Sequence, residues 1–129
     1  AKWADACNIN VDPETLRHKF AVLRDHCETL GRDYNSIIRS TSLEDLVLLK
    51  PGEDPEAATA LARKTLGVNF EDYAKYARIG TIDQTVERVQ RYVDAGANYI
   101  LVSFPRIAYD HEPLYRFAEE VIPHIRSLS

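Results

Sequence analysis

The sequence predicts an α/β fold in which parallel strands alternate with amphipathic helices. Short apolar or β-branched segments at 6–11, 36–43 and 98–104 are each followed by a helical pattern. The third segment, NYILVSF, is almost continuously apolar, which indicates a strand buried on both faces, as in a parallel sheet. Strands in this order are joined by right-handed crossovers. We expect either a compact three-layer domain or three βα units of an eight-stranded barrel.

The first helix has clear signals at both of its ends. Asp12 can cap the amino end, Pro13 suits the first helical position, and Gly31 can close the helix in a left-handed conformation. Between these ends, apolar residues recur at steps of four and three: Leu16, Phe20, Leu23, Cys27 and Leu30. This spacing predicts one buried helical face.

Residues 50–80 are predicted to be a helical insertion between the second and third βα units. Asp54 and the proline after it repeat the chemistry of a helix start, and the alanine-rich segment 57–66 ends at Gly67. A second short helix is expected over 70–77. We therefore expect little sheet structure in this part of the chain.

The last two predicted helices begin beyond this insertion. Thr81 and Gln84 form a capping box, and Gly96 closes the helix that carries Ile82, Val86, Val89 and Val93 on one face. Pro123 should kink the final helix because proline has no N–H group. The apolar face of that helix is expected to contain Leu114, Phe117, Val121, Ile125 and Leu128.

Composition limits the classes of function. Sixteen basic and twenty acidic residues give a net charge of −4, which disfavours nucleic acid as a partner, and no apolar run is long enough for a membrane span. Cys7 and Cys27 do not form a disulfide framework, so we expect reduced thiols and a cytoplasmic protein. The sequence begins at Ala1 and has no methionine, so we expect a fragment of a longer chain.

Five segments occur in a characteristic order along the chain: Trp3-Ala4-Asp5, residues 12–33, Gly80-Thr81, residues 93–97 and residues 118–125. Together they resemble the C-terminal part of the luciferase-like monooxygenase family. The resemblance implies a TIM barrel, (β/α)₈, of about 250 residues, of which this chain holds strands six to eight. It also implies an oxidoreductase that uses FMN or a deazaflavin coenzyme to pass hydride equivalents to a small-molecule substrate or to oxygen.

The family's glycine-rich phosphate-binding segment would precede Trp3 and is not in this sequence. We therefore expect residues 1–129 to be a partial barrel that is inactive alone and binds no cofactor by itself. Two alternatives remain at this stage. One is a small non-catalytic α/β binding or assembly domain, and the other is a different barrel that binds phosphate.

In such a barrel, the chemistry lies at the carboxyl ends of the strands. The resemblance therefore makes Asn8, Asn10, Ser103 and Arg106 candidate cofactor-binding residues. The amides suit a flavin ring edge or a ribityl hydroxyl, and Arg106 suits a phosphate. The structural alternatives are turn chemistry for the two asparagines, a barrel-layer position for Ser103 and a surface position for Arg106.

His111 is the candidate catalytic residue because imidazole beside the carboxylate of Asp110 is the chemistry of a general base. The alternative is that Asp110 caps the final helix. No metal site is expected, since His18, His26 and His124 lack ligand spacing.

Three strands cannot close a barrel, so sheet edges and apolar strand surface should remain uncovered. We therefore expect the isolated chain to form a homo-oligomer or a swapped dimer.

Overall fold

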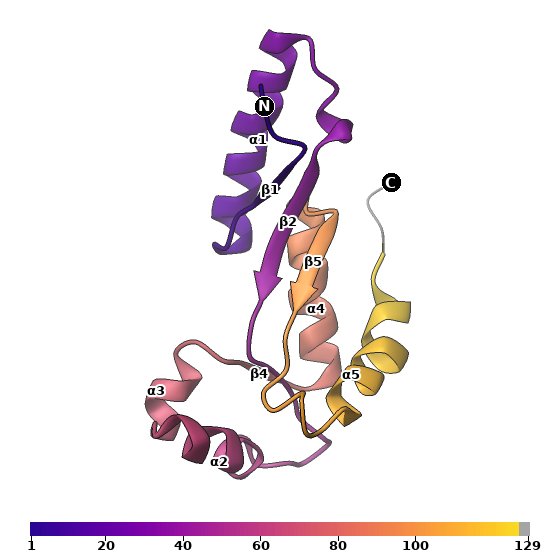
Figure 1. The fold of residues 1–129 in the computed structure, drawn as a ribbon. Helices are drawn as coiled ribbons and strands as arrows, with labels where there is room; N and C mark the ends of the chain where they lie inside the picture. The colour runs from indigo at the N-terminus through magenta and orange to yellow at the C-terminus, as the bar shows by residue number, and fades with distance from the viewer. Residues whose placement is uncertain (127–129) are drawn as a thin grey trace. The chain divides into compact units, whose positions relative to one another are not determined.

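A computed structural model describes residues 1–126, which divide into two compact units (Figure 1). The first unit contains residues 1–42, 89–101 and 126, and the second contains residues 43–88 and 102–125. Both units have parallel strands together with helices. The predicted α/β class with parallel strands is therefore confirmed.

The first unit is built on a sheet in the order β1-β2-β5, with strands β1 (Ala6–Asn8), β2 (Ile38–Leu43) and β5 (Tyr99–Val102). β1 and β2 are parallel, and their register places Ala6 opposite Ile38. Beside β5, a reciprocal pair of hydrogen bonds joins two residues. The Asn98 amide donates to the Arg39 carbonyl at 3.0 Å, and the Arg39 amide donates to Asn98 Oδ1 at 2.7 Å.

The prediction that the apolar segment 98–104 is buried on both faces was wrong. Tyr99 is 56% exposed and Leu101 is 46% exposed, whereas Ile100, between them, is only half-buried. Ile38 of β2 is also exposed. The described chain therefore covers one face of these strands and leaves apolar side chains uncovered on the other. We call Ile38, Tyr99 and Leu101 the exposed strand residues.

Helix α1 (Pro13–Leu30) begins and ends as predicted. Asp12 accepts a hydrogen bond from the Thr15 amide at 3.0 Å, and Gly31 closes the helix with φ 65°. Three of its predicted apolar positions are fully buried or nearly so: Leu16, Phe20 and Cys27. Leu30 lies in the last turn and is exposed, because the apolar stripe runs to the end of the helix, where the core does not cover it.

The second unit contains two paired strands in a part of the chain where the sequence predicts little sheet structure. β3 (Leu46–Leu48) and β4 (Arg78–Gly80) are parallel. Helices α2 (Pro55–Leu66) and α3 (Phe70–Ala74) lie between them in sequence. The structure therefore has strands β1 to β5 within residues 1–126, not the three that the sequence indicates, because two three-residue strands carry too little pattern to be recognised.

The capping box of α4 (Ile82–Asp94) is confirmed. The Thr81 amide donates to Gln84 Oε1 at 2.9 Å, and the Gln84 amide donates to Thr81 Oγ1 at 3.3 Å. No helix within residues 1–126 has the length and hydrophobicity needed to cross a membrane.

The final helical region is irregular, as Pro123 predicts. A short helix α5 (Glu112–Arg116) is followed by a π-helical segment (Phe117–Val121) and then by a 3₁₀ turn (Ile122–His124). Pro123 cannot donate to the carbonyl four residues before it, so the α-helical bonding pattern is not maintained there. The predicted apolar position Leu128 lies outside the described residues.

Candidate functional site

The second unit contains a cavity of about 310 Å³. Its walls come from β3 and the segment after it, from α2 and α3, from the loop at 105–110 and from α5. We call it the unit-two cavity. Sites for small molecules span about 300–1,000 Å³, so this cavity suits a small ligand or one arm of a larger one. Its walls carry as many carboxylates as cations, and the polar side chains among them are Lys50, Glu53, Thr59, Tyr73, Arg106, Asp110, Glu112 and Arg116.

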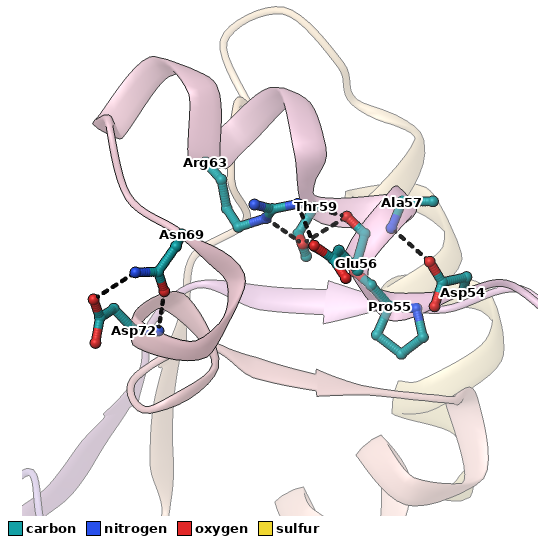
Figure 2. Close-up of polar contacts among 8 residues, drawn as sticks. All are labelled: Asp54, Pro55, Glu56, Ala57, Thr59, Arg63, Asn69 and Asp72. Carbon is teal, nitrogen blue, oxygen red and sulfur yellow. Dashed lines mark hydrogen bonds and ion pairs between the residues drawn. The ribbon is translucent and has the colours of Figure 1, made fainter.

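Helix α2 provides one wall and is stabilised by its own polar contacts (Figure 2). Asp54 accepts a hydrogen bond from the Ala57 amide at 3.0 Å and so caps the helix. The Thr59 hydroxyl donates to the Pro55 carbonyl at 2.9 Å and accepts from Arg63 Nε at 3.1 Å. Because both functions of this hydroxyl are satisfied within the helix, Thr59 shapes the cavity wall.

Tyr73 lies on α3, whose first turn is fixed by Asn69: Asn69 Oδ1 accepts from the Asp72 amide at 2.8 Å (Figure 2). The Tyr73 side chain lines the cavity and is completely buried, and its hydroxyl has no hydrogen-bond partner within residues 1–126. Burial, with a smaller effect from Asp45, raises the pKa of Tyr73 to about 12. The phenol is therefore a neutral donor near pH 7. The sequence did not reveal it, since a tyrosine in a short helix resembles any core aromatic.

Two cations of the cavity wall have protein partners. Lys50 Nζ lies 3.0 Å from Glu112 Oε1. Arg116 donates from Nη1 to the Leu48 carbonyl at 2.9 Å and from Nε to Glu120 Oε1 at 3.1 Å. These contacts connect α5 to the segment around β3, so both side chains have structural roles. The sequence analysis did not select either residue.

Arg106 is the predicted site residue that the structure places at this cavity. Its guanidinium lies 5.1 Å from the centre of the Tyr109 ring, and it forms no ion pair with any residue of the described chain. Its backbone has φ 60°, a left-handed conformation that few non-glycine residues adopt. Such strain is often retained at binding sites.

Ser103 and Asp110 are both engaged by backbone groups. The Asp45 amide donates to Ser103 Oγ at 3.3 Å, and the Glu112 amide donates to Asp110 Oδ1 at 3.0 Å. Asp110 therefore holds the start of α5, which favours the capping alternative. His111 is not among the residues that line the cavity, and its side chain caps nothing in α5.

The predicted residues Asn8 and Asn10 lie in the first unit, where they connect β1 and the segment after it to β2. Asn8 Oδ1 accepts from the Ser40 hydroxyl at 2.9 Å, and Asn10 Oδ1 accepts from the Ser42 amide at 2.9 Å. Both amide oxygens thus hold strands together. Their role in cofactor binding stays a prediction.

Among the cations of the unit-two cavity, Arg106 is the one that forms no ion pair within residues 1–126, so its guanidinium can bind an oxygen acceptor or an anionic group of a ligand. No catalytic step follows from these residues alone. Among residues 1–126, no group of three or more histidine, cysteine, aspartate or glutamate side chains is placed to hold a metal ion.

Comparisons with known proteins bear on the fold. No protein-family model matches the sequence, and no curated protein does. Among solved structures, the chain is similar to coenzyme F420 dependent tetrahydromethanopterin reductase from Methanopyrus kandleri, with 17% identity and a TM-score of 0.62. The match covers 97% of this chain and 46% of the reductase. At this identity the likeness shows a shared fold: the chain folds like a part of that reductase, over a little less than half its length.

Proposed function

We propose that the chain is the C-terminal part of a flavin- or deazaflavin-dependent oxidoreductase of the luciferase-like class. In this proposal it supplies a set of βα units to a (β/α)₈ barrel, and helices α2 and α3 lie between strands β3 and β4 in sequence. The observation that carries the proposal is the fold likeness to a coenzyme F420 dependent reductase over 97% of the chain. The ordered segments noted in the sequence support the same class independently of the fold.

We propose a deazaflavin as the first candidate cofactor, because the similar structure is named as coenzyme F420 dependent. FMN is the second. When bound, such a group supplies hydride transfer to or from a small-molecule substrate. In this chain, Arg106 would hold an anionic arm of the ligand at the unit-two cavity. The remaining walls of the site would come from outside residues 1–129, so the chain alone is proposed to be inactive.

We also propose that the isolated chain associates with a second copy of itself. In the sheet order β1-β2-β5, the outer edges of β1 and β5 have no strand partner within that sheet. Unpaired edges expose backbone donors and acceptors, and they favour pairing with another chain. The exposed strand residues add apolar surface beside one of these edges.

The function is tested by titrating coenzyme F420, and separately FMN, into the complete protein that carries this sequence while ligand fluorescence is followed. We expect saturable binding of one coenzyme, which Arg106→Ala weakens about tenfold by removing a charge-assisted contact. Lys64→Gln on α2 is the matched control, because this exposed residue is not part of the cavity wall and its loss should leave affinity unchanged. Absence of binding to both coenzymes would contradict the proposal and favour a non-catalytic domain.

A further inference from the structure

The first unit has a separate cleft of about 630 Å³. It is lined by α1, by the 3₁₀ turn Tyr34–Ser36, by the start of β2 and by the turn at 94–98. It therefore lies at the amino ends of β2 and β5, whereas barrel enzymes carry their chemistry at the carboxyl ends of strands. The function proposed above does not use this cleft.

Arg39 forms the buried wall of the cleft and is only 6% exposed. Its guanidinium is held by carbonyl groups: Nε donates to Gly96 at 3.0 Å, and Nη1 donates to Tyr34 at 3.1 Å and to Ile37 at 3.2 Å. No carboxylate within residues 1–126 pairs with it, and its Nη2 makes no hydrogen bond to the described residues. A nearly buried positive charge is thus fixed in place without a negative partner, which is costly unless an anion can approach.

A second guanidinium shares the same aromatic ring. Arg39 lies 4.2 Å from the centre of the Tyr34 ring, and Arg24 of α1 lies 4.8 Å from it. Each contact is a cation–π interaction, yet together they bring two like charges close to one phenol. Both arginines also line the cleft.

The charge of the cleft is positive although the whole chain carries −4. Arg17 also lines it and forms no ion pair among the described residues. The lining residues include one carboxylate, Asp94, and this group already accepts a hydrogen bond from Gln90 Nε2 at 2.8 Å. Three guanidiniums therefore face one carboxylate.

We propose that this cleft binds a phosphate group, carried by a small phosphate ester or present as free phosphate. Guanidinium groups bind phosphate through paired N–H donors, and Arg39 is already oriented by its three carbonyl contacts. Three positive side chains suit a dianion better than a single carboxylate. Arg24 and Arg17 lie on one exposed helical surface, so they can close on the ligand from the α1 side.

The test is an NMR titration of the ¹⁵N-labelled chain with inorganic phosphate and with glycerol 3-phosphate, at constant ionic strength. Signals of Arg39, Gly96 and Asn98 should shift saturably. Binding should be tighter at pH 7.5 than at pH 5, because the second pKa of a phosphate ester is about 6. Tighter binding of the ester identifies an organic phosphate as the ligand, and equal binding identifies free phosphate, so both outcomes support the site.

Variants separate binding from stability. Arg24→Gln should weaken phosphate binding about tenfold, because it removes a charged donor while leaving the buried Arg39 contacts intact. Arg17→Gln provides a second variant on the same helix. Lys19→Gln is the matched control, since Lys19 is exposed on α1 and does not line the cleft. The proposal is overturned by shifts that do not saturate, by equal losses in Lys19→Gln and Arg24→Gln, or by citrate binding more tightly than either phosphate.

Discussion

Arg39 donates a hydrogen bond from Nε to the carbonyl oxygen of Gly96 at 3.0 Å, and this contact holds the start of β2 against the turn that precedes β5. The two residues are far apart in sequence, so the contact closes a long loop within the first unit. The same arginine forms the buried wall of the proposed phosphate-binding cleft, which we call the cationic cleft.

Replacing Arg39 should destabilise the chain substantially. Arg39→Leu would remove the guanidinium donor from the carbonyls of Gly96, Tyr34 and Ile37, of which Tyr34 keeps the Ile37 amide as a donor, and we expect a loss of about 3 kcal/mol in the free energy of unfolding. Urea denaturation followed by circular dichroism measures this. Arg24→Gln should stay within about 0.5 kcal/mol of the parent chain because its side chain is exposed. Equal losses in the two variants would show that the buried contacts of Arg39 contribute little.

Gly96 should tolerate alanine worse than Gly31 does. Gly96 has φ 111°, and a Cβ atom there would lie 3.2 Å from Phe20 Cδ2. Gly31 has φ 65°, and nothing lies within 4 Å of such an atom. We expect Gly96→Ala to cost more than about 2 kcal/mol and Gly31→Ala about 1 kcal/mol, since only the first adds crowding to backbone strain. Thermal denaturation of both variants provides the comparison, and a reversed order would contradict the close approach to Phe20.

Tyr73→Phe should stabilise the chain near pH 7 by about 1 kcal/mol, because it removes a buried hydroxyl that has no hydrogen-bond partner in the described chain.

The free energy of unfolding of the parent chain should also fall at alkaline pH. The unfolded phenol ionises near pH 10, whereas the folded one stays neutral until about pH 12. Chemical denaturation between pH 7 and 11.5 tests both effects, with Tyr115→Phe as the control because Tyr115 is 61% exposed. A destabilised Tyr73→Phe chain would mean that the hydroxyl is satisfied.

Asp12 should make the stability of α1 depend on acid pH. Hydrogen bonds from Thr15 hold the pKa of Asp12 below its ordinary value of about 3.9. A lowered folded-state pKa gives stability that is present above the unfolded pKa and lost as pH falls through the folded value. Asp12→Asn should therefore be less stable than the parent chain at pH 6 and equal to it in strong acid. Melting curves from pH 2 to pH 6 measure this difference, and a constant gap across that range would contradict it.

Self-association should depend on the exposed strand residues. Light scattering on the isolated chain at micromolar concentration should show a species heavier than a monomer, and Leu101→Lys should shift it toward monomer by adding charge at the uncovered surface. Leu61→Lys is a matched control, because Leu61 is 56% exposed on α2 in the second unit. A monomeric parent chain would contradict the expected oligomer.

The sequence predicts best where structure is determined locally. The amino-terminal caps at Asp12 and Asp54, the box at Thr81 and the glycine closures at Gly31 and Gly67 all occur as the pattern indicates. These signals depend on residues within one turn of each other. They therefore do not require knowledge of the rest of the fold.

Features that depend on distant segments were not predictable. β4 has only three residues, which is too short a pattern to recognise. The exposure of β5 depends on which other segments cover the strand and not on its own amino-acid composition. The unit-two cavity joins residues from 47 to 116, so only the folded chain brings Tyr73 and Arg106 to one site. The cationic cleft was missed for a related reason: on α1 alone, Arg24 resembles a solvated side chain, and its significance comes from Tyr34 and Arg39.

The uniformly apolar composition of β5 makes its alignment with β2 vulnerable. Side chains alternate along a strand, so sliding β5 by one residue would exchange Tyr99 and Leu101 with Ile100 and Val102. Either alignment turns two large apolar side chains inward, so hydrophobicity discriminates weakly between them. The reciprocal bonds between Asn98 and Arg39 supply the missing discrimination, because a slipped strand would break both at once. Asn98, together with the contact between Arg39 and Gly96, thus fixes which side of the strand points inward.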